Sequence, residues 1–403
     1  MLLRVILVIT VICRVQPTHA ASFMDMQSLY NNLTMGRNKY LRPQVDYDKA
    51  TDITISFSLL HLGDIDAVEG TVSIAGYFVV SWKDENLVWT PSDFNNTQLV
   101  SLPEDKIWKP PLINANTATE MKLFGQDDTY VQLHYNGTAI WAPGVNLKFM
   151  STIDTTYFPF DKQKCELGII GWRFPENAIT FSSIDTTVLT NMYTPSSEWD
   201  LIETTVDVNN IKTPVIKYTM IYKRRPVFLL ITLILPVVFM ALLNICVFFL
   251  PQDSGERIGF SVTLLLAVVV FLTIAQGLLP ATATPRLSGI CILLLINMIM
   301  SGMIVVSVIV GAWFYYKTDA EAMPHWIQNM VGFNFTDCVY RHSNHVHDSE
   351  IEMAEQNKHV EKCEEKIPWQ AVAAFWDKLC LTFYFLTFVI STLSFFIYVI
   401  SGN

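Results

Sequence analysis

Charged side chains are scarce in this sequence of 403 residues, and they are unevenly placed. Asp, Glu, Lys and Arg make up 16% of the chain, whereas soluble domains carry about a quarter. The deficit lies in two apolar stretches, 226–316 and 379–400, while 21–222 has ordinary polarity. A wholly soluble protein is therefore excluded, and the sequence predicts a polar domain followed by membrane-spanning segments.

Cysteine is also scarce where a secreted domain would use it. Of the seven cysteines, one lies at position 13, three lie in apolar stretches and two lie between those stretches. Only Cys165 is left in the region 21–225. This region can therefore form no internal disulfide, and we expect its stability to come from a hydrophobic core and from neighbouring subunits.

Basic residues and histidines are too few for several common activities. The net charge of −10 provides no surface suited to nucleic acid. Beyond His61 and His134 the polar region has almost no histidine, and no Ser/His/Asp, Cys/His or metal-ligand arrangement stands out in it. We therefore expect neither an enzyme nor a cofactor or metal site.

The N-terminal residues are typical of a secretory signal peptide. An arginine precedes a short apolar run, and small residues follow near position 20. The run is too short for a reliable membrane span, so we expect a signal peptide at 1–20 and an extracellular domain at 21–225. A first transmembrane helix is the alternative reading. Three sequons, at Asn32, Asn95 and Asn136, are expected glycosylation sites.

Short runs with alternating polar and apolar residues fill the extracellular domain between breaks at Gly, Pro, Asn and Asp. Alternation with period two places one face of each strand in a core, which predicts an antiparallel β-sandwich. A short helix is expected before it, at 24–33. The clearest strand-like runs are 53–62, 72–82, 130–135, 138–142, 145–150 and 215–222.

Four apolar runs are long enough to cross a bilayer as helices. Pro236 lies inside the first and removes one backbone hydrogen bond, which packed neighbours can compensate. An even number of spans returns the C-terminus to the outside, although the acidic loop between the last two spans gives the positive-inside rule no support. The expected spans are 226–250, 258–279, 287–315 and 379–400.

The expected membrane domain has three parts after the extracellular domain ends at residue 225. Residues 226–316 hold the first three transmembrane helices. Residues 317–378 form a cytoplasmic loop with an amphipathic helix, whose apolar positions recur among acids and lysines. Residues 379–403 form the fourth transmembrane helix and an extracellular C-terminus.

The second span has one face whose residues are small, hydroxylated or acidic at both ends and apolar in the middle. A ring of such helices would enclose a wettable pore with a hydrophobic constriction at Leu266 and Val270, and an acidic mouth that favours cations. A membrane helix with incidental small residues at a packing interface is the alternative. This face, called the pore stripe below, consists of Glu256, Gly259, Thr263, Leu266, Val270, Thr273 and Gly277.

Eight short motifs follow one another along the chain. They are WKDENLVW at 82–89, WKP at 108–110, STIDTTYFPFDKQKC at 151–165, RRP at 224–226, Pro236, GER at 255–257, LPAT at 279–282, and WQAV with a later DK between 369 and 378. In this order they resemble the Cys-loop receptors, the pentameric ligand-gated ion channels. The third is similar to the signature loop of that family, and the whole set most resembles its nicotinic, cation-conducting branch.

The resemblance implies a ring of five subunits, each with an extracellular sandwich and four transmembrane helices, in the plasma membrane. It places Glu256 at the selectivity ring and Leu266 at the hydrophobic gate, whereas Gly259 departs from the usual Ser or Thr. The Pro-Ala typical of anion-selective relatives is missing at the mouth. The implied partners are four further subunits, identical or different, a small-molecule ligand, membrane lipid and permeating cations.

The signature loop departs from the family at its first cysteine, which is replaced by Ser151. The family's disulfide, worth about 3 kcal/mol for a loop of this length, is therefore missing. A buried free thiol is expected at Cys165, with an intermolecular disulfide as the alternative. The tip of the loop is retained and is expected to contact the membrane helices: Phe158, Pro159, Phe160 and Asp161.

The agonist pocket of relatives is an aromatic box at a subunit interface, which holds a cationic amine. Trp172 matches its central tryptophan, and Tyr77 stands where a complementary-side tryptophan is common. Ala115 and Pro111 replace a usual Tyr and Asp, and the capping loop, about 204–217, has neither an aromatic residue nor an adjacent cysteine pair. We expect no ordinary response to acetylcholine, and Trp172 is either a ligand contact or a core residue.

The junction between the sandwich and the helices is expected to couple ligand binding to pore opening. A buried Arg–Asp cluster that includes Asp161 would be charge-assisted and breakable. The alternative is that the basic residues 223–225 only bind lipid headgroups. Besides the loop tip, the candidate coupling residues are Arg224, Asp64 and Asp66, on the turn after strand 53–62, and Pro280.

Two functions remain open. The first is a subunit of a cation-selective channel gated by an extracellular ligand other than acetylcholine, and the complete pore stripe favours it. The alternative is a modulatory or non-conducting accessory subunit of a mixed pentamer, which the incomplete aromatic box favours.

Overall fold

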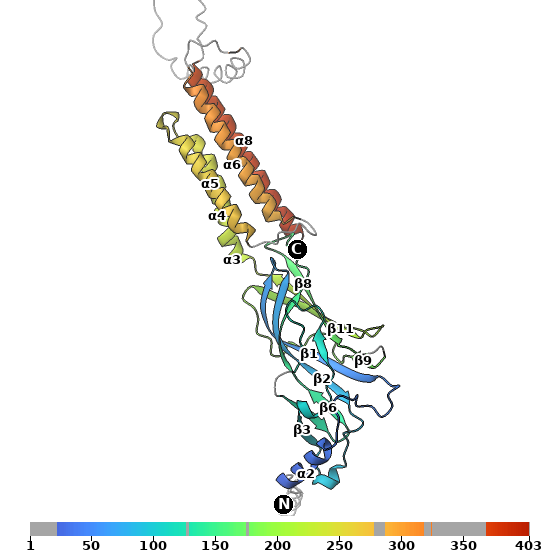
Figure 1. Ribbon diagram of the computed structural model, residues 1–403. Coiled ribbons are helices and arrows are strands. Elements are labelled where there is room, and N and C mark those ends of the chain that lie inside the picture. Colours follow the sequence, from blue (N-terminus) through green and yellow to red (C-terminus); the bar gives the residue numbers. More distant parts are fainter. Residues whose placement is uncertain are drawn as a thin grey trace, which may run out of the picture. The chain divides into compact units, whose positions relative to one another are not determined.

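The computed structural model describes residues 22–125, 129–174, 177–277, 287–317, 324 and 368–402. These residues form two compact units, which Figure 1 shows as a β-rich part and a helical part. The sandwich unit comprises the chain up to Ile153 and Lys162–Arg225, and the helical unit comprises Asp154–Asp161 and the chain from Pro226 onward. The expected signal peptide, most of the expected cytoplasmic loop and Pro280 lie outside the described residues.

The sandwich unit begins with helix α2 (Phe23–Thr34), which confirms the helix expected at 24–33. The Ser22 hydroxyl accepts a hydrogen bond from the backbone N–H of Asp25, and the Asp25 carboxylate accepts one from the backbone N–H of Ser22. This reciprocal cap satisfies N–H groups that the first turn of a helix leaves open. Leu29 and Leu33 are buried and attach the helix to the hydrophobic core.

The larger of the two sheets has seven strands in the order β3-β5-β6-β2-β1-β9, with β7 also pairing with β2. Its pairings are antiparallel except that of β1 with β9, which is parallel. The strands are β1 (Thr51–Asp66), β2 (Thr71–Lys83), β3 (Leu99–Pro103), β5 (Tyr130–His134), β6 (Thr138–Trp141), β7 (Gly144–Met150) and β9 (Ile179–Ser182).

The smaller sheet has four antiparallel strands in the order β10-β11-β8-β4. Two short 3-10 helices, η1 (Pro91–Phe94) and η2 (Glu104–Lys106), flank β3. The strands of this sheet are β4 (Leu112–Asn114), β8 (Lys162–Gly171), β10 (Trp199–Asn209) and β11 (Val215–Arg224).

The hydrophobic core of this unit contains residues of both sheets. The rings of Phe57 on β1 and Phe78 on β2 lie 5.4 and 6.0 Å from the ring of Tyr218 on β11. The hydroxyl of Tyr218 donates a hydrogen bond to the carbonyl of Ile55, so a buried polar group is satisfied across the core. Buried and less buried positions alternate along β2, which confirms the expected β-sandwich.

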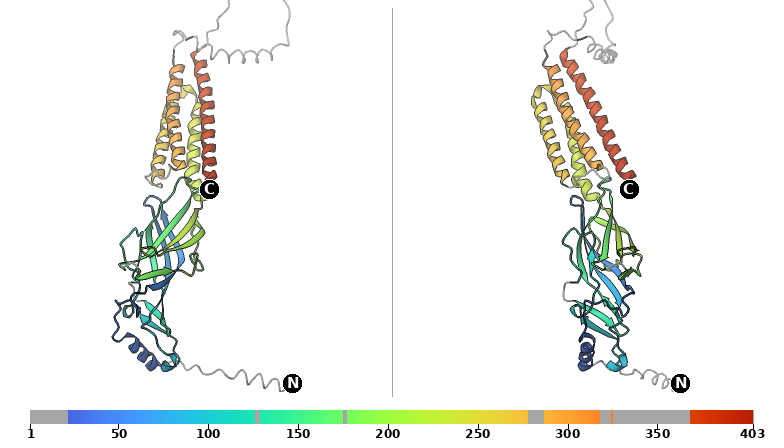
Figure 2. Two further views of the ribbon diagram at one scale, coloured as in Figure 1. Left: turned by 90° about the vertical axis from the view of Figure 1, so that its right-hand side faces the viewer. Right: turned by 45° about the vertical axis from the view of Figure 1, so that its right-hand side comes forward.

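Within the described residues, the helical unit contains four helices that are long and apolar enough to span a membrane, as expected (Figure 2). The first span is continuous through four segments: α3 (Val227–Leu229), the π-helical η3 (Leu230–Ile234), α4 (Leu235–Ile245) and the 3-10 helix η4 (Cys246–Phe249). The others are α5 (Glu256–Gln276), α6 (Gly289–Tyr315) and α8 (Trp369–Ser401), with the 3-10 helix η5 (Gln252–Ser254) before α5.

The π-helical turn ends at Ile234, two residues before Pro236. A proline has no N–H to donate, and its ring crowds the carbonyl four residues earlier in an α-helix. The wider turn accommodates that ring, so the span continues without a break.

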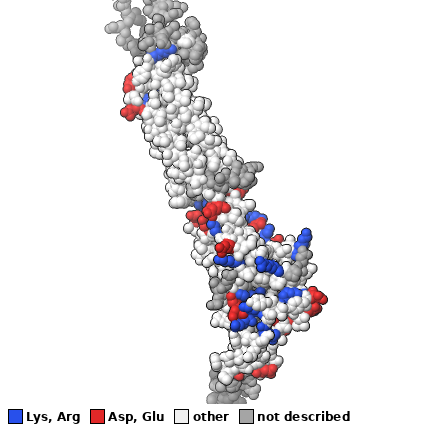
Figure 3. Space-filling view, viewed as in Figure 1, with Lys and Arg blue, Asp and Glu red and all other residues white. Residues whose placement is uncertain are grey.

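Helix α8 begins at Trp369, ten residues before the span expected at 379–400, so it includes the end of the expected amphipathic stretch as well as that span. Pro368 has an extended conformation directly before the first helical residue, and no breaker follows it. The amphipathic stretch and the membrane span are therefore one helix in this part of the chain. Charged side chains are nearly absent from the visible surface of the helical unit between its ends (Figure 3).

Candidate functional site

Helix α5 leaves the pore stripe uncovered by the rest of the described chain. All seven stripe residues are exposed. The opposite side packs against this chain's other helices through four buried residues, Arg257, Ser261, Val268 and Ala275. The open side is wider than the stripe, because Phe260, Val262 and Val269 are exposed too and are available to neighbouring helices or lipid.

The pore stripe begins directly after a tight turn whose backbone conformation requires a glycine. Gly255 has a φ of 65°, a left-handed conformation that side chains with a Cβ rarely adopt, and Glu256 follows it as the first residue of α5. One turn later, a methyl group added at Gly259 would have no atom of the described residues within 4 Å apart from its own helix backbone and its chain neighbours. The foot of the stripe is thus an exposed carboxylate followed by open space.

The middle and outer parts of the stripe differ in polarity. The hydroxyls of Thr263 and Thr273 donate to the carbonyls of Gly259 and Val269, at 2.8 and 3.1 Å, so their oxygen lone pairs stay available as acceptors. Between them, Leu266 and Val270 are 63% and 53% exposed. An apolar band of this kind between acceptor groups can exclude water when several copies converge.

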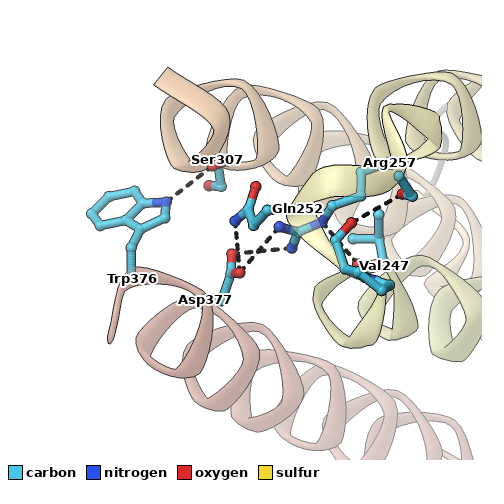
Figure 4. A network of polar contacts seen from close by, with 8 residues as sticks. Val247, Gln252, Arg257, Ser307, Trp376 and Asp377 are labelled. Carbon is cyan, nitrogen blue, oxygen red and sulfur yellow. Dashed lines mark hydrogen bonds and ion pairs between the residues drawn. The ribbon is translucent and has the colours of Figure 1, made fainter. Parts of the chain in front are cut away.

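The foot of α5 is attached to α8 by a buried ion pair that the sequence did not reveal (Figure 4). The guanidinium of Arg257 donates two hydrogen bonds to the carboxylate of Asp377, at 3.0 and 3.1 Å. Two motifs contained these residues, but their pairing depends on a contact between positions 120 residues apart. A charged residue that lies in an apolar helix but off the pore stripe was the available signal, because such a residue needs a partner once it is buried.

The tip of the signature loop, Asp154–Asp161, belongs to the helical unit. Phe158 is buried in a cluster of apolar residues from all four helices, and the ring of Tyr157 lies 5.5 Å from that of Tyr398 on α8. The N–H of Gly289, the first residue of α6, donates to the carbonyl of Thr156 at 3.1 Å. The contact with the membrane helices expected of this tip is present, including a buried Pro159 and a half-buried Phe160.

The other candidate coupling residues have distinct surroundings. The strand expected at 53–62 continues to Asp66, so Asp64 and Asp66 lie in β1 and not on the turn after it. Asp66 accepts hydrogen bonds from the backbone N–H groups of Val68 and Glu69, which caps that turn, and Asp64 is exposed. The guanidinium of Arg224 lies over the ring of Trp199 at 4.1 Å, and Asp161 is buried.

Trp172 and Tyr77, the two expected ligand contacts, lie on different sheets. Trp172 follows β8 and is 36% exposed, so it is a surface residue and the core alternative is wrong for it. Tyr77 is half-buried in the middle of β2 and pairs with Gly144 of β7. The backbone N–H of Trp172 donates to the carbonyl of Pro111, which places the substituted box position beside the tryptophan.

The capping loop is the turn of the β10–β11 hairpin and is short. Its Asn210 side chain exchanges two hydrogen bonds with the backbone of Phe181 on β9, at 2.8 and 2.9 Å. Ile211, Lys212 and Thr213 at the tip are exposed. The hairpin thus supplies no ring to the surface near Trp172.

Cys165 is a fully buried free thiol on β8, and the Ser151 hydroxyl donates a hydrogen bond to the carbonyl of the preceding residue, Lys164, at 3.3 Å. Burial raises the pKa of the Cys165 thiol to about 12. A thiol with so high a pKa carries almost no thiolate at neutral pH and is unreactive. The serine–cysteine pair occupies the place of the disulfide that the family resemblance implies.

The three sequon asparagines, Asn32, Asn95 and Asn136, are all exposed, on α2, after η1 and on the β5–β6 turn. They are accessible to a glycosylating enzyme, although their modification stays a prediction. No group of three or more His, Cys, Asp or Glu side chains within the described ranges is placed to hold a metal ion.

Comparison with known proteins covers both units. Residues 26–226 match the family model of the neurotransmitter-gated ion-channel ligand binding domain, and residues 233–344 match that of the neurotransmitter-gated ion-channel transmembrane region. The human neuronal acetylcholine receptor subunit alpha-2 is 28% identical over 309 residues, which are 74% of this chain and 58% of that protein.

Two further relatives give the same picture. The rat subunit alpha-6 is 28% identical over 314 residues, covering 75% of this chain and 63% of the relative. The goldfish (Carassius auratus) subunit alpha-3 is 28% identical over 311 residues, covering 75% and 60%. The matched part thus spans about three-fifths of the length of these curated relatives.

Proposed function

The chain belongs to the neurotransmitter-gated ion-channel family, and we propose that it is a subunit of a cation-selective pentameric channel opened by an extracellular ligand. An extracellular ligand-binding domain followed by four membrane-spanning helices makes it a multi-pass receptor of the plasma membrane. Proteins of this family are channels and not enzymes. The conducting role, the ion preference and the ligand are the proposal.

The observation that carries the proposal is the uncovered side of α5. Seven residues with the polarity pattern of an ion pathway lie on that side, and none of the residues that the structure describes covers them. In a membrane, an exposed carboxylate and two exposed hydroxyls are costly against lipid but favourable against water. Five copies that turn these stripes toward a common axis satisfy the polar groups and make a pore.

Selectivity for cations follows from the mouth of that pore. Five copies of Glu256 form a ring of negative charge, which concentrates cations and repels anions. Leu266 and Val270 form the constriction that closes by excluding water, and Gly259 leaves the space above the ring wide.

We infer that the ligand is a small molecule other than acetylcholine. A cationic amine is held by several rings at once, and this chain offers an exposed Trp172 and a half-buried Tyr77 on different sheets. We propose that Tyr77 completes a pocket at Trp172 from a neighbouring subunit. Ala115 and the short β10–β11 hairpin supply no aromatic ring to two further sides of the pocket. A site at this interface would therefore bind a ligand that depends less on aromatic contacts.

The test is expression of the chain alone in oocytes under voltage clamp. Leu266→Thr makes the constriction wettable, and we expect it to produce a standing cation current without any ligand. The matched control is Val268→Thr, a change of similar polarity on the buried side of the same helix, which should produce none. Absence of current from Leu266→Thr at normal surface expression would contradict conduction by this chain alone.

The second candidate is a modulatory or non-conducting subunit of a mixed pentamer. The incomplete aromatic wall around Trp172 favours it, because such a subunit needs to supply only one side of a pocket. Co-expression with a related subunit decides between the two. Under this alternative, Leu266→Thr gives current only when the second subunit is present.

A further inference from the structure

The guanidinium of Arg257 is enclosed at the foot of the helical unit, and Arg257 is only 3% exposed. Its Nη1 and Nη2 atoms donate to the two carboxylate oxygens of Asp377, and its Nε donates to the carbonyl of Val247 at 3.3 Å. Figure 4 shows these groups converging from η4, α5 and α8. A bidentate pair with a third hydrogen bond satisfies a buried arginine well.

Asp377 is engaged from a second direction as well. The side-chain amide of Gln252, in η5, donates to its Oδ2 atom at 2.8 Å. The Asp377 carboxylate therefore connects α8 with both the start of α5 and η5. Among the residues that the structure describes, Asp377 is the acid that forms an ion pair with Arg257.

Arg257 follows Glu256 directly in the sequence, yet the two side chains have opposite surroundings. Successive residues of an α-helix differ by about 100° in direction. Glu256 is thus exposed on the open side of α5, while Arg257 is buried on the packed side. An arginine this close to the mouth would cancel much of the negative charge of the ring unless another acid neutralised it.

We propose that Asp377 is a positioning residue for ion selectivity: it neutralises Arg257 and holds it away from Glu256, so that the mouth of the pore keeps a net negative charge. This inference rests on the proposed function, because it assigns Asp377 a role in cation conduction at the Glu256 ring. The fourth helix, which lies outside the pore stripe, would then contribute to the charge that permeating ions meet.

A purely structural role for the ion pair is the competing explanation. Other contacts attach α8 and η5 to α6. The Trp376 indole donates to the carbonyl of Ser307 at 3.0 Å, the Tyr384 and Ser307 hydroxyls are hydrogen-bonded at 2.8 Å, and the Tyr315 hydroxyl donates to Asp253. Removing both charges of a buried ion pair is often tolerated, whereas removing one leaves an uncompensated charge. The two roles therefore predict different results for single and double variants.

The experiment measures the potential at the mouth without needing current. Gly259→Cys places a thiol one turn from Glu256. Isolated membranes are treated with a cationic and an anionic methanethiosulfonate of similar size, and the rate at which each reagent modifies this thiol is measured. The chain without this cysteine gives the background rate. In Asp377→Asn we expect the cationic-to-anionic rate ratio to fall roughly tenfold, equivalent to about 1.4 kcal/mol. Asp377→Glu, and the neutral pair Arg257→Gln with Asp377→Asn, should keep the ratio of the parent.

An unchanged ratio in Asp377→Asn would overturn the proposal, as would a neutral pair that is as impaired as the single variant. If the Asp377→Asn protein does not accumulate in the membrane, Arg257→Gln provides the test. It removes the positive charge, so the cationic-to-anionic rate ratio should stay the same or rise. A fall in this ratio would contradict the proposal.

Recording Na⁺ and Cl⁻ permeability in the Leu266→Thr background separates this inference from the proposed function. If the rate ratios change as expected but no current flows, conduction by this chain is refuted and the role of Asp377 stands. If a cation current flows and Asp377→Asn does not change its selectivity, the role of Asp377 is refuted and the proposed conduction stands.

Discussion

The Asp84 carboxylate, directly after β2, is only 4% exposed. It accepts a hydrogen bond from the backbone N–H of Asn86 at 2.9 Å. Burial nevertheless raises the pKa of Asp84 to about 6, against the opposing effects of that hydrogen bond and of the charge of Arg37. A shift from 3.8 to about 6 costs on the order of 3 kcal/mol once the group is ionised.

This cost predicts a pH-dependent effect of Asp84→Asn on stability. Between 3.8 and about 6 the folded chain binds more protons at Asp84 than the unfolded chain, so the free energy of unfolding falls as pH rises through this window. Thermal unfolding in detergent should give a melting-temperature gain of Asp84→Asn over wild type that grows up to about pH 6 and is then constant. The exposed Asp48→Asn is the control, and a gain that shrinks with rising pH would contradict the assignment.

The Ser151–Cys165 pair allows a direct test of the missing clamp. Since the Ser151 hydroxyl donates to the carbonyl of Lys164, directly before Cys165, Ser151→Cys should form an intramolecular disulfide when the chain is expressed through the secretory pathway. Closing this loop of about 15 residues should stabilise the sandwich unit by about 3 kcal/mol, and a reducing agent should abolish the gain. Mass spectrometry of the non-reduced protein checks the bond, with Ser151→Ala as the control; two free thiols after oxidation would contradict the placement.

Single residues were predictable where the side chain and its local spacing define the role. The stripe from Glu256 to Gly277 follows from the helical period alone, and the lone Cys165 follows from counting. The Arg257–Asp377 pair joins two motifs that give no sign of each other, so only the folded chain reveals it. The surface position of Trp172 likewise depends on how β8 ends.

At the scale of elements, the loop tip Asp154–Asp161 is the segment of the signature loop that packs against the membrane helices. It leaves the sandwich unit between β7 and β8 and buries Phe158 among the helices. Long apolar runs and period-two alternation predicted the helices and most strands, because burial imposes those patterns. Their ends were less predictable: β1 continues to Asp66 through two irregularities of register, and α8 starts at Trp369.

Removing the buried ring should destabilise the helical unit. Phe158→Ala deletes an aromatic side chain from a packed cluster, a change that typically costs about 3–5 kcal/mol. Phe160→Ala is the matched control, because Phe160 is only half-buried and should cost clearly less. Thermal unfolding in detergent measures both, and equal effects of the two variants would mean that Phe158 is not the anchor of the loop.

At the scale of the whole molecule, each unit has its own hydrophobic core, and the part of one chain that the structure describes leaves the pore stripe of α5 exposed. The proposed selectivity ring needs an assembly, because a single Glu256 at the foot of one helix encloses nothing. Conduction, as proposed, is therefore a property of a group of subunits.

The ring predicts the effect of removing its charge. In a conducting Leu266→Thr background, Glu256→Gln keeps the side-chain volume but deletes the negative charge, so the permeability of Na⁺ relative to Cl⁻ should fall. Reversal potentials in diluted NaCl measure this ratio, and Glu203→Gln in the sandwich unit is the control. Selectivity that survives Glu256→Gln would place the charge filter elsewhere.

The most direct test of the account is a cryo-electron microscopy structure of the assembled protein purified from membranes. The account predicts five subunits around a central axis, with Glu256, Thr263, Leu266 and Val270 of each α5 facing that axis. A closed assembly in which these side chains face lipid or pack against another helix, with no continuous central path, would contradict it.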